Sequence, residues 1–195
     1  MGAIDNSDIG IVEEQKQGRL LHQAALDFFT SKAVNGLSLA KTPTGKYDFV
    51  RIDDIVWLPR GAFEFARHSR NKEIEAACTF VVRDVIGDPF DIIAWQATTG
   101  RVATWINRAS MIGEDELFAP RLTDGLLVHE TPLAWFQERR VGVVVIDKTR
   151  AAPKLRDASP LLASSMEHGE RLQKMMRVDA PKILVPSRMA LKVAA

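Results

Sequence analysis

The chain has 195 residues, of which 46% are hydrophobic and 26% charged, the composition of an ordinary folded protein of one domain or one and a half. The longest apolar stretch, Val141–Ile146, is far shorter than the roughly 20 residues that a membrane-spanning helix requires. A single cysteine, Cys78, excludes a disulfide framework or a thiolate zinc site within the chain. The first residues, 1–8, are acidic where a secretory signal is basic, so we expect a cytoplasmic protein without membrane partners.

Charge is distributed unevenly along the chain. Residues 139–195 contain twelve Lys and Arg against five acids, so this end carries about +7 and the remainder about −6, which together give the net charge of +1. Such asymmetry favours an anionic partner for the basic end, either a nucleic acid or an acidic protein. It also fits attraction between copies of the chain in a homo-oligomer.

The first half of the sequence predicts one helix followed by a strand. Apolar residues recur at three- and four-residue intervals from Val12 to Val34, and Asn35-Gly36 is a suitable helix stop. A turn over 41–46 follows, and the alternation of Tyr47–Ile52 is typical of a half-buried strand.

The middle of the chain predicts an antiparallel meander. The segment from Pro59 to Ala77 suits one or two short helices, and Cys78–Ile86 has the β-branched and aromatic content of a strand. The segments Phe90–Gln96 and Arg101–Ile106, on either side of a Thr-Thr-Gly turn, are expected to pair as antiparallel strands.

After Pro120 the pattern changes to alternating strands and helices. Thr131 and Pro132 form a helix start, and Ser159-Pro160 forms another. Glu167 with Arg171, and Glu170 with Lys174, have the spacing of solvent-facing ion pairs on the second helix. The predicted elements are a strand at 126–128, a helix at 132–140, a strand at 143–146, a helix at 161–176 and a strand at 183–185.

The fold class expected from these elements is mixed α/β. Residues 1–120 form an N-terminal helix and antiparallel meander region, and residues 121–195 a basic β-α-β-α-β region with parallel pairing. The seam falls near Pro120 to Gly125, and we expect both regions to form one compact unit.

Two carboxylates follow neighbouring predicted strands. His129-Glu130 ends one strand and Asp147 ends the next, and ligands of parallel α/β sheets bind beyond the carboxyl ends of the strands. Glu130 and Asp147 are therefore candidate catalytic residues that together could hold Mg²⁺. The alternative is structural: Glu130 favours the start of the helix that it precedes, and Asp147 opens a loop.

This arrangement resembles the Toprim domain of primases and topoisomerases, in which a glutamate follows the first strand and an Asp-x-Asp pair follows a later one. The resemblance covers about residues 126–185. The sequence departs from the family because Lys148 and Thr149 follow Asp147, and no acid follows 183–185 in the chain. Segments 87–95, 131–135 and 167–170 are also similar to uncharacterised bacterial proteins of the prophage type.

Six cations near the second strand are candidate ligands of phosphate or nucleic acid. For the first two of them the alternative is stabilisation of a helix C-terminus, and for the others an ordinary solvated loop. The six are Arg139, Arg140, Lys148, Arg150, Lys154 and Arg156.

The leading hypothesis is a non-catalytic binding or accessory protein of phage or mobile-element type, whose basic C-terminal part contacts nucleic acid or an acidic partner. One alternative is a metal-assisted phosphoryl-transfer or hydrolytic enzyme that uses Glu130 and Asp147. Another is a structural subunit of a homo-oligomer. The four histidines show no metal-binding spacing, and His168 is expected at a helix boundary or surface. No cofactor is expected, except Mg²⁺ if the chain is an enzyme.

Overall fold

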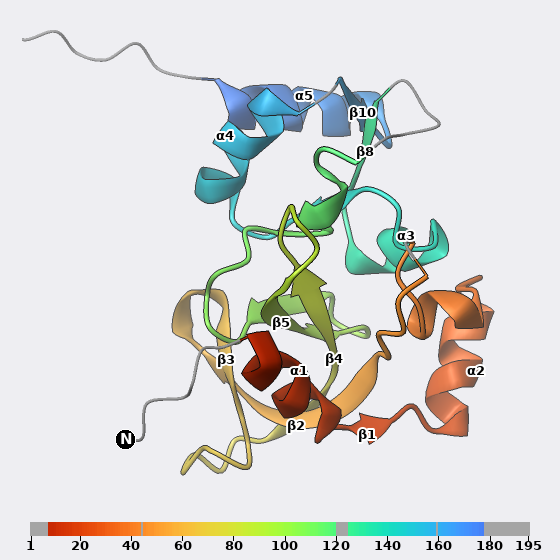
Figure 1. Ribbon diagram of the computed structural model, residues 1–195, viewed down its shortest axis with the longest axis vertical. Helices are drawn as coiled ribbons and strands as arrows, with labels where there is room; N and C mark the ends of the chain where they lie inside the picture. Colours follow the sequence, from red (N-terminus) through yellow and green to blue (C-terminus); the bar gives the residue numbers. More distant parts are fainter. Residues whose placement is uncertain (1–7, 44, 120–124, 159, 178–195) are drawn as a thin grey trace, which may run out of the picture.

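The computed structural model describes residues 8–43, 45–119, 125–158 and 160–177 (Figure 1). The fold is mixed α/β, as predicted, and contains two sheets. The helices are α1 (Asp8–Lys16), α2 (Gln23–Ser31), α3 (Pro132–Gln137), α4 (Lys148–Asp157) and α5 (Met166–Met176), with single-turn 3₁₀ helices η1 (Gly36–Leu39), η2 (Pro59–Gly61) and η3 (Glu114–Glu116). The strands are β1 (Arg19–Leu20), β2 (Arg51–Leu58), β3 (Ala62–Phe65), β4 (Glu75–Arg83), β5 (Pro89–Gln96), β6 (Arg101–Thr104), β7 (Met111–Ile112), β8 (Leu126–His129), β9 (Val143–Val145) and β10 (Leu161–Ala163).

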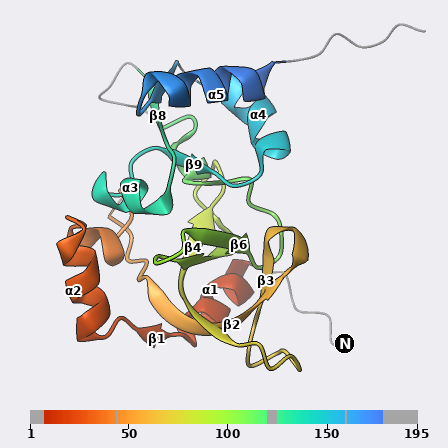
Figure 2. The same ribbon diagram turned by 180° about the vertical axis from the view of Figure 1, so that it is seen from behind.

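The first sheet closes on itself. Its order is β1-β2-β3-β6-β5-β4, and β2 also pairs with β4. The hairpin of β5 and β6 pairs antiparallel, as predicted, with Trp95 opposite Val102. Helix α1 packs against β4 and β5 (Figure 2).

Side chains of β4 and β5 alternate between the two faces of the sheet, and most of them are buried on both faces. One set of side chains packs with Ile11 of α1 in the interior of the closed sheet. The alternate set, which includes Phe80 and Trp95, packs against Phe29 of α2 and Phe136 of α3. Helices from both halves of the chain therefore share one core.

The second sheet has the order β10-β8-β9-β7. Strands β8, β9 and β10 are parallel to one another, and β7 pairs antiparallel with β9. The predicted strands at 126–128 and 143–146 are β8 and β9, but the second helix and the third parallel strand are not the segments that were predicted. Gly142, at the start of β9, has a φ of +85°, and a Cβ atom there would overlap the Leu127 carbonyl oxygen. Only glycine fits this approach of the two strands.

Several predicted elements were wrong. The helix predicted over Val12–Val34 is two helices, α1 and α2, because residues 19–20 between them pair antiparallel with β2 as β1. The short helices predicted between Pro59 and Ala77 do not form, except for the single turn η2, because this part of the chain pairs as β3 and the start of β4. The strand predicted at 47–52 begins at Arg51 and runs on to Leu58.

The basic region also differs from the prediction. Residues 148–157, expected in a loop, form α4, and residues 161–163, expected in a helix, form β10. The predicted strand at 183–185 lies outside the described residues, as does most of the predicted seam. Strand β7, which precedes the seam, pairs with β9, which follows it. In the described residues no helix is long and apolar enough to cross a membrane.

Candidate anion-binding cleft

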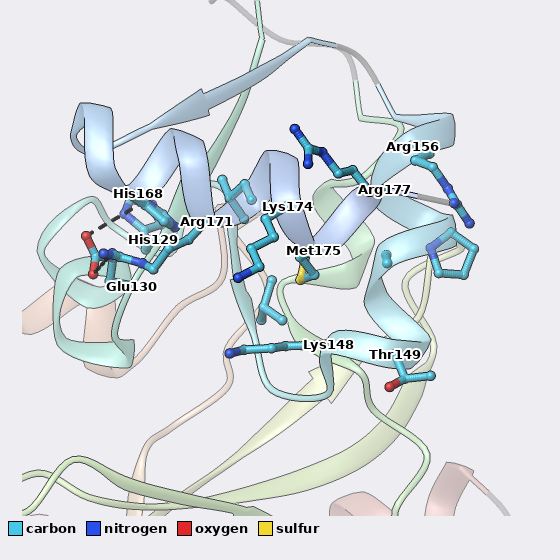
Figure 3. A pocket seen from close by; sticks show the side chains of 14 residues that line it. His129, Glu130, Lys148, Thr149, Arg156, His168, Arg171, Lys174, Met175 and Arg177 are labelled. Carbon is cyan, nitrogen blue, oxygen red and sulfur yellow. Dashed lines mark hydrogen bonds and ion pairs between the residues drawn. The ribbon is translucent and has the colours of Figure 1, made fainter. Parts of the chain in front are cut away.

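A cleft of about 980 Å³ lies between α4, α5 and the carboxyl ends of β8 and β9 (Figure 3). Helices α4 and α5 lie side by side at one end of the molecule (Figure 1). The position matches the rule that ligands of parallel sheets bind beyond the carboxyl ends of the strands. The residues that line the cleft are His129, Glu130, Val145, Lys148, Thr149, Ala152, Pro153, Arg156, His168, Arg171, Leu172, Lys174, Met175 and Arg177.

Helical spacing divides the cations of α4 between two faces. Lys148, Ala152 and Arg156, four residues apart, line the cleft. Arg150 and Lys154 lie on a different face of the helix and do not line it. Of the six cations predicted to bind an anion, Lys148 and Arg156 therefore reach the cleft.

Arg150 fastens α4 to the segment that precedes β7, and Lys154 fastens it to η3, which follows β7. The Arg150 guanidinium donates to the carbonyl oxygens of Asn107, Arg108 and Ala109 at 2.8 to 3.1 Å. The Lys154 ammonium lies 2.5 Å from the carboxylate of Glu114, whose side chain is 3% exposed. These contacts occupy both cations, so their role is structural.

Arg140 was predicted to bind an anion at an exposed surface. This prediction was wrong, because Arg140 is only 1% exposed. Its guanidinium donates to the carbonyl oxygens of Ser38 and Asp48 at 2.5 and 2.9 Å. Burial lowers the pKa of Arg140 to about 10, although the nearby Asp48 carboxylate partly offsets this. Arg139 is exposed beside Lys41, in a different hollow from the cleft.

Asp147 is the N-cap of α4. One carboxylate oxygen accepts hydrogen bonds from the backbone N–H groups of Thr149 and Arg150, and the other accepts from Nε of Arg150 at 2.7 Å. The hydrogen bond from the Arg150 side chain is the main reason why the pKa of Asp147 is lowered. Unlike Glu130, Asp147 does not line the cleft. The structure thus gives the two predicted catalytic carboxylates different surroundings.

Glu130 lies in the wall of the cleft. Its Oε2 accepts a hydrogen bond from Nη2 of Arg171 at 2.6 Å, and its Oε1 accepts one from Oγ of Ser164 at 3.1 Å. Nδ1 of His168 lies 3.9 Å from Oε1. The sequence predicted that Arg171 pairs with Glu167 along the helix, whereas Arg171 reaches across the cleft wall to Glu130.

Two histidines beside Glu130 have defined hydrogen-bonding roles when neutral. His129 is 8% exposed and donates from Nε2 to the Val141 carbonyl at 2.8 Å, so its Nδ1 is an acceptor. His168 is 5% exposed rather than at the predicted surface, and its Nδ1 accepts from the Ser164 backbone N–H at 3.3 Å, which leaves the proton on Nε2. Burial, more than any neighbouring charge, lowers the pKa of His168 and favours this neutral form.

The remaining cations of the cleft point toward open space (Figure 3). Within the described parts of the chain, the side-chain nitrogens of Lys148, Lys174 and Arg177 have no hydrogen-bond or ion-pair partner, and Arg156 makes one long contact, 3.4 Å, with the Met176 carbonyl. Five cationic side chains against one carboxylate leave a formal charge of +4 when both histidines are neutral.

Sequence reasoning missed the contribution of α5 to the cleft. Arg171 and Lys174 were predicted as members of solvent pairs, and Arg177 was not singled out. The available signal was that α5 follows a strand of the parallel sheet, which places its cations near those of α4. Among the residues that the structure describes, no group of three His, Cys, Asp or Glu side chains is placed to hold a metal ion.

No family model and no curated protein matches the chain. One solved structure, the zinc-binding and RNA polymerase domains of the primase of Aquifex aeolicus, is similar at a TM-score of 0.46 with 10% sequence identity. The match covers 90% of this chain and 54% of that one, so this chain spans about half of the primase fragment.

Proposed function

We propose that this chain is a non-catalytic protein that binds the phosphate backbone of a nucleic acid in the cleft between α4 and α5. One observation carries the proposal: five exposed cations of α4, α5 and the C-cap of α5 line one cleft. Among the described residues that line it, the one carboxylate, Glu130, is already paired with Arg171. Phosphate contacts by Lys and Arg supply most of the affinity of proteins that bind nucleic acids without reading sequence.

The position of these cations supports a ligand rather than a solvated surface. Lys148 and Lys174 come from different helices and lie on the same cleft (Figure 3). Like charges repel across such a gap, so their convergence is unfavourable for the isolated protein. An anion placed between them would remove this repulsion.

The test is binding of a fluorescent single-stranded oligonucleotide of about twelve nucleotides, within the usual site sizes of about 4 to 16. Anisotropy is measured between about 50 and 200 mM salt. Binding should weaken steeply with salt. The triple variant Lys148→Gln, Lys174→Gln, Arg177→Gln should bind at least tenfold more weakly, and its slope of log K against log salt should be shallower by about 2, since each phosphate contact contributes about 0.7.

A matched control separates a site from a general charge effect. Lys46, Arg70 and Lys72 are exposed cations outside the cleft, and their joint replacement by Gln makes the same change in net charge. This control should keep the wild-type slope. Absence of binding at low salt, or equal losses in both triple variants, would refute the proposal.

The alternatives predict different results. An enzyme that used Glu130 and Asp147 with Mg²⁺ would lose turnover in the Asp147→Ser variant, which retains a helix cap. A homo-oligomer held by its acidic and basic regions would dissociate with salt in sedimentation. Both alternatives, and the relation to phage or mobile elements, stay predictions.

A further inference from the structure

The Glu130 carboxylate is the feature of the cleft that phosphate binding does not explain. It is the one acid among the described residues that line the cleft, and its negative charge repels a phosphate. Its side chain is 44% exposed, so Glu130 is not part of the buried core. Ionised carboxylates have about four acceptor sites, and the contacts with Arg171 and Ser164 use two of them.

A second acceptor lies beside Glu130. Because His129 donates its Nε2 proton to the Val141 carbonyl, Nδ1 of the neutral ring carries a lone pair, and no hydrogen bond within the described chain uses it. Figure 3 shows His129, Glu130, His168 and Arg171 gathered at one end of the cleft, next to Lys174. Acceptors here adjoin the cations that would hold phosphate.

Acceptors next to a phosphate site are complementary to the hydroxyl groups of ribose. Carboxylates hydrogen-bond the ribose 2′-OH in dinucleotide sites, and the 2′-OH is the group by which proteins distinguish RNA from DNA. Deoxyribose lacks this donor. The phosphates of a DNA strand would therefore be repelled by Glu130 without a hydrogen bond from a 2′-OH to offset the repulsion.

We propose that the cleft selects single-stranded RNA over DNA, with Glu130 and His129 as acceptors for a ribose 2′-OH and Lys148 and Lys174 on the neighbouring phosphates. This inference rests on the proposed function, namely that a nucleic acid strand occupies the cleft. It adds a specificity-determining role for the one carboxylate that lines it.

The experiment compares three oligouridylates of equal length and sequence by anisotropy with the full chain: the ribo form, the 2′-deoxy form and the 2′-O-methyl form. The ribo form should bind about tenfold more tightly than the deoxy form, a preference equivalent to about 1.4 kcal/mol. The 2′-O-methyl form retains an acceptor but cannot donate, so it should bind no better than the deoxy form.

The Glu130→Ala variant should bind the deoxy form more tightly and lose most of its preference for the ribo form. Affinity for the deoxy form should rise, because a negative charge is removed, while the preference for the ribo form should fall from about tenfold to less than about threefold. The control is Glu170→Ala, which removes an exposed acid of α5 that does not line the cleft. It should keep the full preference.

The possible failures are distinguishable. Equal binding of all three strands by the wild-type chain, with losses in the Lys148, Lys174, Arg177 variant, would overturn the selectivity and leave the proposed function standing. A preference for RNA that survives Glu130→Ala would also overturn the inference, because another group would then read the hydroxyl. Failure of every strand to bind at low salt would overturn both proposals.

Discussion

The Asp91 carboxylate offers the sharpest test of how the fold supports the cleft. Asp91 is fully buried, at 0% exposure. One carboxylate oxygen accepts from the backbone N–H groups of Ile92 and Ile106 at 2.8 and 3.0 Å, and the other from Arg108 and Ala109 at 2.7 and 3.0 Å. Asp91→Asn is nearly isosteric, but its amide nitrogen must face two of these N–H donors.

The expected cost follows from those two donors. A hydrogen bond to a charged group contributes about 1.5 to 3 kcal/mol, so losing two should lower the free energy of unfolding by about 3 to 6 kcal/mol. This is a large part of the roughly 5 to 15 kcal/mol available to a domain. The change in the free energy of unfolding is measured by urea unfolding, with circular dichroism as the signal. The control, Asp88→Asn, changes an exposed acid that directly precedes β5 and should shift stability by less than about 0.5 kcal/mol. A loss below about 1 kcal/mol in Asp91→Asn would refute the reasoning.

Three further outcomes are expected. Gly142→Ala should destabilise the chain by more than about 2 kcal/mol in the same assay, because the left-handed backbone alone costs about 1 to 2 kcal/mol and the new methyl group meets the Leu127 carbonyl. Asp147→Ala should cost about 1 kcal/mol through loss of the α4 cap, whereas Asp147→Ser should cost less, and equal losses would contradict the capping role. For His168 the folded pKa is lowered from 6.5, so the unfolded chain takes up the proton first and the wild type should lose stability as the pH falls below about 6.5. In urea unfolding at several pH values, His168→Gln should lack this part of the pH dependence. If the variant loses stability at low pH as the wild type does, His168 is not its cause.

Elements with strong local signals were predictable from the sequence. The Thr131 cap with Pro132 placed α3 correctly, and the run Val143–Ile146 placed β9 in the interior of a sheet, parallel to β8 and antiparallel to β7. The turn at 97–100 fixed the β5–β6 hairpin. In each case the cap, turn or apolar run that predicts the element lies within the element or directly beside it in the sequence.

Elements that depend on distant partners were not predictable. Residues 62–65 contain alternating Phe63 and Phe65, yet the run is too short to be distinguished from a helix by periodicity alone, and pairing with β2 decides the outcome. Helix α4 contains Pro153, which argues against a helix from sequence alone. Its stability depends on the Asp147 cap and on burial of Ala151 and Leu155, neither of which a pattern of charges reveals.

The candidate site was predictable in position but not in membership. The rim beyond β8 and β9 is where the cleft lies, because parallel strands end on the same side. Which cations face it depends on the helical phase of α4. Treated as a loop, the segment made Arg150 and Lys154 equivalent to Lys148 and Arg156, whereas the helix turns the first pair toward the fold and the second toward the cleft.

The cleft also depends on residues from the first half of the chain. Arg150 donates to the carbonyl oxygens of 107–109, and Asp91 accepts from N–H groups of the same segment. A side chain of β5 and a side chain of α4 therefore hold the same loop. Glu114 then anchors Lys154. Some of the groups that orient α4 therefore lie before residue 120, outside the basic region that contains the cations. Binding in the cleft should be sensitive to Asp91 even though Asp91 does not line it.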